Sequence, residues 1–107
     1  LWKSTARKSV TVASATSPAI PDYADEVILT GTTATTELVP TNISAGRLLS
    51  VRGTDATGPA LTDTAVGSTA ANKMHLSAAL TLANGSAILF CQAPNGSWWE
   101  IGRAANG

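Results

Sequence analysis

Short segments with alternating apolar residues, each ended by Gly, Asn or Pro, constrain the fold of this chain more than any other feature. Runs of this length, bounded by turn residues, are typical of β-strands. Four stretches follow the pattern: EVILTGT (26–32), GRLLSVRGT (46–54), SAILFCQ (86–92) and SWWEIGR (97–103). The sequence therefore predicts an all-β fold of short strands.

Two Asn-Gly dipeptides, Asn84–Gly85 and Asn95–Gly96, precede the last two of these segments. The dipeptide is typical of two-residue hairpin turns, because both turn positions need a positive φ. Together they predict an antiparallel meander.

The stretch 73–85 fits two patterns. Helical spacing connects Met74, Ala78 and Leu82, whereas apolar residues also alternate strictly from 74 to 82. We expect a strand here, because a hairpin turn follows it.

Bulky and charged side chains are scarce in this chain. Charged residues make up 13%, against roughly 25% in an ordinary soluble domain, while Ala, Thr and Ser supply 44 of the 107 positions. So small a chain gains by burying apolar surface against copies of itself. The segments SAILFC and SWWEI carry apolar residues on both faces, which predicts covering on both sides, one layer being another subunit.

Charge balance and the length of apolar runs exclude several classes of partner. Seven basic and seven acidic residues cancel, so we expect no binding to nucleic acid or to a charged membrane surface. The longest apolar run, 87–91, is too short for membrane insertion. Cys91 has no second cysteine to pair with, and we expect it to be a buried small hydrophobe.

Candidate catalytic and metal-binding residues are few. Asp55 and Asp63 flank a Gly/Thr/Ala loop and could form the carboxylate pair of a glycosidase, but loop aspartates more often bond nearby backbone amides. His75 has neither a nucleophile elbow nor enough further ligands within one chain. We predict no catalytic residue, no cofactor and no metal, with three His75 side chains around a threefold axis as the alternative.

The closing strand carries two tryptophans and two charges. Adjacent strand residues point to opposite faces, so Trp98 shares a face with Glu100, and Trp99 shares one with Ile101. In a covered strand Glu100 and Arg103 each need a partner or access to solvent. Glu100 could instead form an ion pair with Arg47 or Arg52.

An ordered set of motifs resembles the C-terminal module of bacteriophage tailspikes and tail fibres. It comprises EVILTGT (26–32), GRLLSVRG (46–53), NKMHL (72–76), NGSAILF (84–90) and NGSWWEIGR (95–103). In that family such a series, ended by a Trp-x-Glu-x-x-Arg strand, closes a trimeric β-structure at the tip. The resemblance implies that the trimer framework consists of Gly46, Arg47, Asn72, Leu76, Trp98, Glu100 and Arg103.

The resemblance also implies a place for the chain in a larger particle. Residues 26–107 would form the trimeric domain, and residues 1–25 a linker from an upstream β-helical domain that would hold any depolymerase activity. The chain would belong to the virion tail, outside the host cell, and its partner would be a bacterial surface polysaccharide such as O-antigen or capsule.

We therefore expect an all-β, short-stranded antiparallel β-sandwich or β-prism-like domain that forms an intertwined homotrimer and is not an enzyme. Trp99, which the family pattern does not require, is the candidate for glycan contact. The alternative is a dedicated carbohydrate-binding module in which Trp99 or Trp98 stacks on a sugar. A free-standing hydrolase using Asp55 and Asp63 is a third class.

Overall fold

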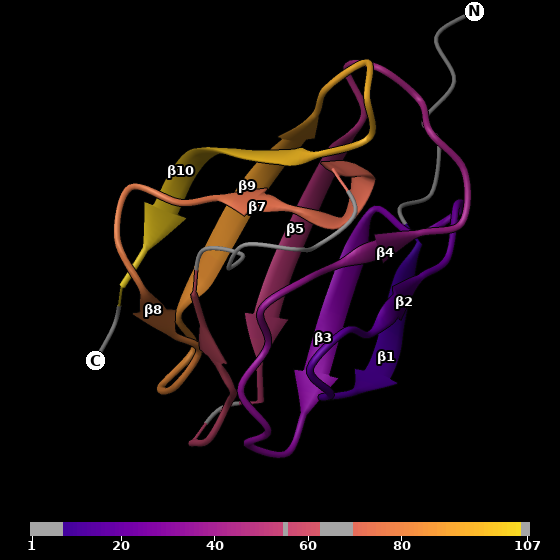
Figure 1. Ribbon diagram of the computed structural model, residues 1–107. Helices are drawn as coiled ribbons and strands as arrows, with labels where there is room; N and C mark the ends of the chain where they lie inside the picture. The colour runs from indigo at the N-terminus through magenta and orange to yellow at the C-terminus, as the bar shows by residue number, and fades with distance from the viewer. Residues whose placement is uncertain (1–7, 55, 63–69, 106–107) are drawn as a thin grey trace, which may run out of the picture.

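The computed structural model describes residues 8–54, 56–62 and 70–105. Within these ranges the fold is all-β, with no α-helix (Figure 1). The elements in chain order are β1 (Ser9–Ala13), β2 (Ala19–Ile20), β3 (Glu26–Thr30), β4 (Val39–Pro40), β5 (Leu48–Gly53), β6 (Ala60–Leu61), the 3₁₀ turn η1 (Ala70–Asn72), β7 (Met74–His75), β8 (Leu80–Thr81), β9 (Ala87–Gln92) and β10 (Trp98–Ala104). The strands β3, β5, β9 and β10 match the four expected segments to within two residues at each end, so that prediction is confirmed.

A six-stranded sheet in the order β1-β3-β5-β9-β10-β7 forms one side of the molecule. The first three strands are parallel to one another, and β7 is parallel to β10. The long strand β9 is antiparallel to both of its neighbours, β5 and β10. The sheet is therefore mixed.

Successive turns of the chain stack on one another in the first half of the fold. After β1 the chain crosses to a second layer at β2, returns at β3, crosses again at β4 and returns at β5 (Figure 1). In that second layer β2 and β4 are parallel, and Val39 N–H donates to the Pro18 carbonyl at 2.9 Å beside them. This is a β-solenoid-like arrangement.

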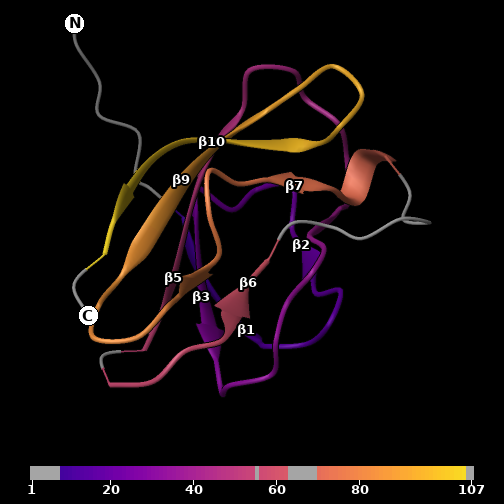
Figure 2. The same ribbon diagram turned by 60° about the vertical axis from the view of Figure 1, so that its left-hand side comes forward.

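The expected antiparallel sandwich or prism is therefore wrong for the single chain. Each connection between β1, β3 and β5 runs through the opposite layer, so the next strand enters in the same direction and the pairing is parallel. The second layer consists of the two-stranded pieces β2-β4 and β6-β8 rather than a second full sheet (Figure 2).

One apolar core fills the space between the layers. Alternate residues of the sheet point inward, and one row across four strands consists of Val10, Val27, Val51 and Ile88. Val10 is partly buried, and the other three are fully buried or nearly so. Rows of branched side chains at this spacing stabilise the pairing of neighbouring strands.

The boundary expected at residue 25 needs correction. β1 pairs with β3 over its whole length, and Ile20 and Ala24 belong to the buried core. Residues 9–25 are thus part of the folded domain rather than a linker, because their apolar side chains complete the first stacked turn. The upstream β-helical domain stays a prediction.

Both Asn-Gly turns are present, but they act differently. At Asn84–Gly85 both residues have a positive φ, 57° and 79°, as expected. At Asn95–Gly96 only Gly96 does, at 96°, and hydrogen bonds between Ala93 and residues 96 and 97 close a three-residue hairpin loop between β9 and β10. The expected meander is wrong, since β8 pairs with β6 and not with β9.

The stretch 73–85 is extended rather than helical, as expected. It forms two short strands, β7 and β8, separated by a bend at 77–78. Met74, Leu80 and Leu82 point into the core.

Candidate functional site

The closing strand β10 places two neighbouring indoles on opposite sides of the sheet. Trp98 is fully buried, and its Nε1 donates to the Leu38 carbonyl at 3.0 Å. The Phe90 ring meets it edge-on with centroids 6.4 Å apart, and the guanidinium carbon of Arg47 lies 5.6 Å from its centroid. An indole with its N–H satisfied and its rings packed is part of the framework. Trp98, which the resemblance assigns to the framework, thus lies in the core of its own chain.

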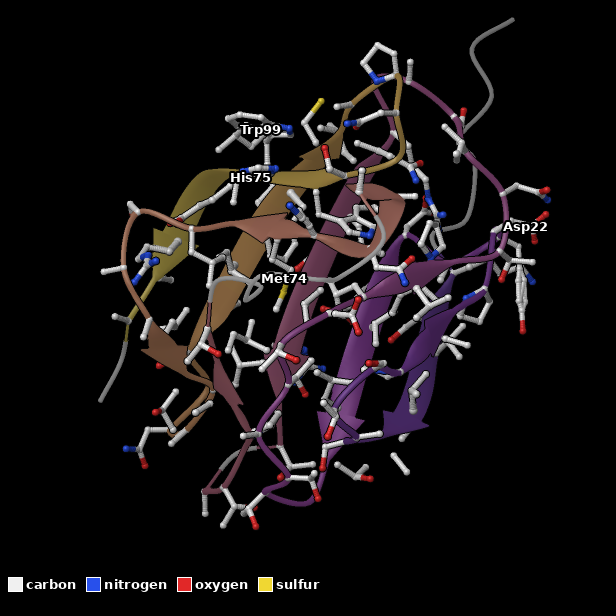
Figure 3. The ribbon with its side chains drawn as sticks, in the orientation of Figure 1. Asp22, Met74, His75 and Trp99 are labelled. Atoms are coloured by element: carbon white, nitrogen blue, oxygen red, sulfur yellow. The ribbon has the colours of Figure 1, made fainter. Side chains whose placement is uncertain are left out.

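Trp99 lies on the outer face of the sheet and is 49% exposed. Its Nε1 donates to Ser97 Oγ at 3.0 Å. The His75 ring stacks on it with centroids 3.9 Å apart and planes inclined by 13°. Figure 3 shows His75 against Trp99, whereas Met74 of the same strand points into the molecule. The indole is therefore held in one orientation with part of it open to solvent.

An open groove of about 690 Å³ runs beside Trp99. Its lining is mainly apolar and comes from the loop before β5 and from the β9–β10 hairpin: Ala45, Gly46, Cys91, Ala93, Pro94 and Ile101 join Trp99 and Gln92. The Gln92 side chain is buried and ties the two walls together, because it accepts from Ser44 N–H at 3.1 Å and donates to the Gly96 carbonyl at 3.2 Å.

The outer face of the six-stranded sheet is apolar at the end where Trp99 lies. One row across the strands is Leu48, Cys91, Trp99 and His75, and Leu89 follows in the next row. Leu48, Leu89, Trp99 and Ile101 are 36–56% exposed. Cys91 is only half-buried and is a free thiol, so its expected full burial is wrong. Within the ranges that the structure describes, no second sheet lies over these residues.

Charge on this face is neutralised locally. Arg52 Nε lies 3.0 Å from Glu26 Oε2, and Ser9 Oγ donates to Glu26 Oε1 at 2.8 Å. Burial acts to raise the pKa of Glu26, but the hydrogen bonds from Ser9 and Arg52 outweigh it and lower the pKa below its ordinary value. The outer face thus has an apolar end and a polar end at which the charges of Glu26 and Arg52 neutralise each other.

Glu100 and Arg103 pair with each other at the free edge of β10. A β-bulge between residues 100 and 102 brings both onto one side of the strand, where Arg103 Nε lies 2.6 Å from Glu100 Oε2. Glu100 also accepts from the N–H and Oγ of Ser77, and Arg103 Nη2 donates to the Ala78 carbonyl. The pair ties the 77–78 bend to β10.

The ionisation of this pair follows from its hydrogen bonds. The Arg103 guanidinium, helped by Ser77, lowers the pKa of Glu100 to about 2, and the carboxylate in turn raises the pKa of Arg103. The alternative partners considered for Glu100 are engaged elsewhere, since Arg52 pairs with Glu26 and Arg47 bonds the backbone.

Gly46 and Arg47 hold the loop before β5. Gly46 has a φ of +87°, and its N–H donates to the Gln92 carbonyl at 2.8 Å. Arg47 Nη2 donates to the carbonyls of Pro21 and Ala24 at 2.7 and 2.6 Å, and burial lowers the pKa of its guanidinium. These two residues therefore join the first stacked turn to β5 and Trp98.

Asn72 and Leu76 complete the set of framework residues on the other side of Trp98. The Asn72 carbonyl accepts from Leu38 N–H at 3.0 Å, and its Nδ2 lies 3.5 Å from Glu37 Oε2. Leu76 is partly buried against the core. All seven framework residues thus have contacts within one chain, in one cluster around Trp98 and another at Glu100–Arg103. Their role in a trimer stays a prediction.

Three features of the site were not predicted from the sequence. They are the stacking of His75 on Trp99, the two hydrogen bonds by which Gln92 joins the walls of the groove, and the hydrogen bond from Trp99 to Ser97. The stack depends on the pairing of β7 with β10, a parallel contact between segments that no turn signal connects. The burial of Gln92 gave no signal, because the strand pattern treats it as a polar strand end.

The described part of the structure gives no support to the residues considered for catalysis or metal binding. Asp55 and Asp63 lie outside the described residues. Among the residues that the structure does describe, no three His, Cys, Asp or Glu side chains gather as a metal site would require. A search of the same ranges for a helix able to cross a membrane finds none.

Comparison of the chain with protein-family models, with curated proteins and with solved structures finds no match.

Proposed function

We propose that this chain is the C-terminal trimerisation and tip module of a bacteriophage tailspike or tail fibre. In this role it joins three copies through its outer sheet face and presents the assembled end of the virion tail to a polysaccharide on the host surface. The module itself performs no catalysis.

The observation that supports this proposal is the apolar end of the outer face. Four large apolar side chains on two adjacent strands and the neighbouring β5 are partly exposed: Leu48, Leu89, Trp99 and Ile101. Contiguous exposed apolar surface on so small a domain indicates a protein contact, because monomers seldom keep it open to water.

The charges around this surface favour a copy of the same chain as the partner. Among the described residues, Glu26 and Arg52 on the outer face pair with each other, and none of the exposed apolar residues Leu48, Leu89, Trp99 and Ile101 is charged. The whole chain has a formal net charge of zero. A charged partner would form no ion pairs with this apolar surface, whereas a second apolar face would bury the exposed apolar side chains.

Paired variants of the outer face test the proposal. Leu89→Ser and Ile101→Ser each replace an exposed apolar side chain on that face, and Tyr23→Ser does so on a distant loop, where Tyr23 is 56% exposed. We expect the first two to weaken association at least tenfold, with an unchanged β-sheet spectrum, and the control to keep it. Equal association in all three variants would contradict the proposal.

A dedicated carbohydrate-binding module is the second candidate, and the His75–Trp99 stack favours it. An indole held in one orientation beside a groove of about 690 Å³ offers a surface on which a sugar ring could stack. A glycan array on the wild type and on Trp99→Ala is the test. Binding by a monomeric wild type that disappears in the variant would support this candidate over the trimer.

A further inference from the structure

A shallow apolar hollow lies on the outer face, beyond the large side chains. It measures about 280 Å³ and is lined by Ser50, Ala87, Ile88, Leu89, Gly102, Arg103 and Ala104. Four of these residues are small and come from three adjacent strands: Ser50, Ala87, Gly102 and Ala104. A Cβ added to Gly102 would meet no atom within 4 Å, so the space above this residue is open.

This hollow is unsuited to a small molecule. Binding sites for such ligands commonly occupy about 300–1,000 Å³ and place several polar groups on the ligand. The hollow lies at the lower edge of that range, and its exposed lining surface is mainly apolar. Its size and chemistry fit a few apolar side chains.

Side chains of that kind stand on the same face at the other end. We define the ridge as Leu48, Trp99 and Ile101, which are 49–56% exposed. Ile101 is the extra residue of the β-bulge in β10. It has no pairing partner on β9, so the bulge displaces it from the regular strand pairing. Along β10 the ridge residues 99 and 101 are followed directly by the hollow residues 102 and 104.

We infer that the ridge of one copy fills the hollow of the next copy around the trimer axis. The inference rests on the proposed trimer and states which surfaces meet. Ridge and hollow are different patches on one face, so their contact is heterologous, and a heterologous contact forms a ring of three copies when its rotation is threefold. The ridge carries no charged residue, and Arg103 beside the hollow is already paired with Glu100, so the contact buries no unpaired ion.

Gly102→Leu tests the inference by filling the hollow from within. The added Cβ meets no atom within 4 Å and Gly102 faces an open hollow, so the single chain should fold as before. Thr81→Leu adds the same side chain at an exposed position of β8, in the opposite layer, and is the matched control. We expect Gly102→Leu to shift the mass in solution from trimer to monomer, with the sheet spectrum kept, and Thr81→Leu to stay trimeric. A trimeric Gly102→Leu would overturn the inference.

Cysteine pairs identify the contact independently. In a Cys91→Ser background, Ile101→Cys marks the ridge and Ala104→Cys marks the hollow, and both positions are exposed. We expect the double variant to form disulfide-linked dimers and trimers under mild oxidation, and each single variant to stay unlinked, because a disulfide needs Cα atoms within about 7 Å.

The outcomes separate the two proposals. Linking by Ile101→Cys alone would mean that like patches meet and would overturn the inference. A trimer whose double variant fails to link would place the interface elsewhere and leave the proposed trimer intact. A monomeric wild type would contradict the proposed function itself.

Discussion

At the scale of single residues, neighbours in the chain perform different tasks because a strand alternates its faces. Trp98 fills the core beside Phe90 and Arg47, whereas Trp99 lies outside and stacks with His75. The side chains of both are oriented by hydrogen bonds from their indole N–H groups. The facing of this strand is the part of the site that alternation alone predicts.

Alanine variants of the two tryptophans should separate these tasks. We expect Trp98→Ala to lower the free energy of unfolding by about 3–5 kcal/mol, because it removes a large buried side chain. Trp99→Ala should cost less than about 1.5 kcal/mol in the single chain, since half of that side chain is already in water. Thermal or chemical melts of both variants make the comparison, and a larger loss for Trp99→Ala would show that the facing is inverted.

The Glu100–Arg103 pair should make stability depend on pH. The folded-state pKa of Glu100, about 2, lies below the ordinary value of 4.5, so the pair's contribution is present above about pH 4.5 and is lost as the pH falls toward 2. Glu100→Gln should therefore destabilise the chain by about 1–3 kcal/mol at pH 7 and by much less at pH 2. Urea melts of both proteins at the two pH values measure this, and an equal loss at pH 7 and pH 2 would contradict it.

At the scale of elements, local patterns predicted the strands and missed how they pair. Segments 26–32, 46–54, 86–92 and 97–103 each became a strand, because each has five or more residues with a clear period of two. The second layer was missed, since β2, β4 and β6 have two residues each and carry no periodicity, and the alternation over 74–82 does not show that β8 belongs to a different layer from β7. Parallel strands are not joined by a tight turn, so no turn motif in the sequence indicates which of them pair. For the same reason the pairing of β7 with β10 was not predicted.

Close approach between the layers gives a prediction at this scale. A Cβ on Gly53, at the end of β5, would collide with the Leu82 backbone oxygen just after β8, whereas one on Gly102 would meet nothing. Gly53→Ala should therefore cost about 1–3 kcal/mol, because neither backbone can move without disturbing its layer. In the single chain Gly102→Ala should be neutral or slightly stabilising, because its Cβ meets no atom within 4 Å. Melts of the two variants test the prediction, and equal stabilities would show that the layers are further apart than described.

At the scale of the whole molecule, the fold consists of stacked turns closed by a hairpin, with one sheet face left open. β9 and β10 add antiparallel strands where a further parallel turn would otherwise stack on β5. Solenoid-like folds need such a closing element, because an open end exposes strand edges and core. The open face, in contrast, has no closing element among the described residues, and the proposed trimer supplies one.

The chain alone should release no sugar from a polysaccharide. The two pockets described above contain no Asp or Glu and no His, and the loop aspartates Asp55 and Asp63 have only spacing in their favour. Incubation with surface polysaccharides from a panel of host strains should yield no new reducing ends. Reducing ends that form with the wild type and disappear with Asp55→Asn or Asp63→Asn would establish a hydrolase.

The mass of the wild-type chain in solution tests the proposed assembly most directly. Sedimentation equilibrium at micromolar concentration should give three times the mass of one chain, since burying the apolar end of the outer face favours association. The sheet spectrum, recorded on the same sample, should be that of a folded all-β protein. A folded chain that sediments as a monomer over this range would contradict the account.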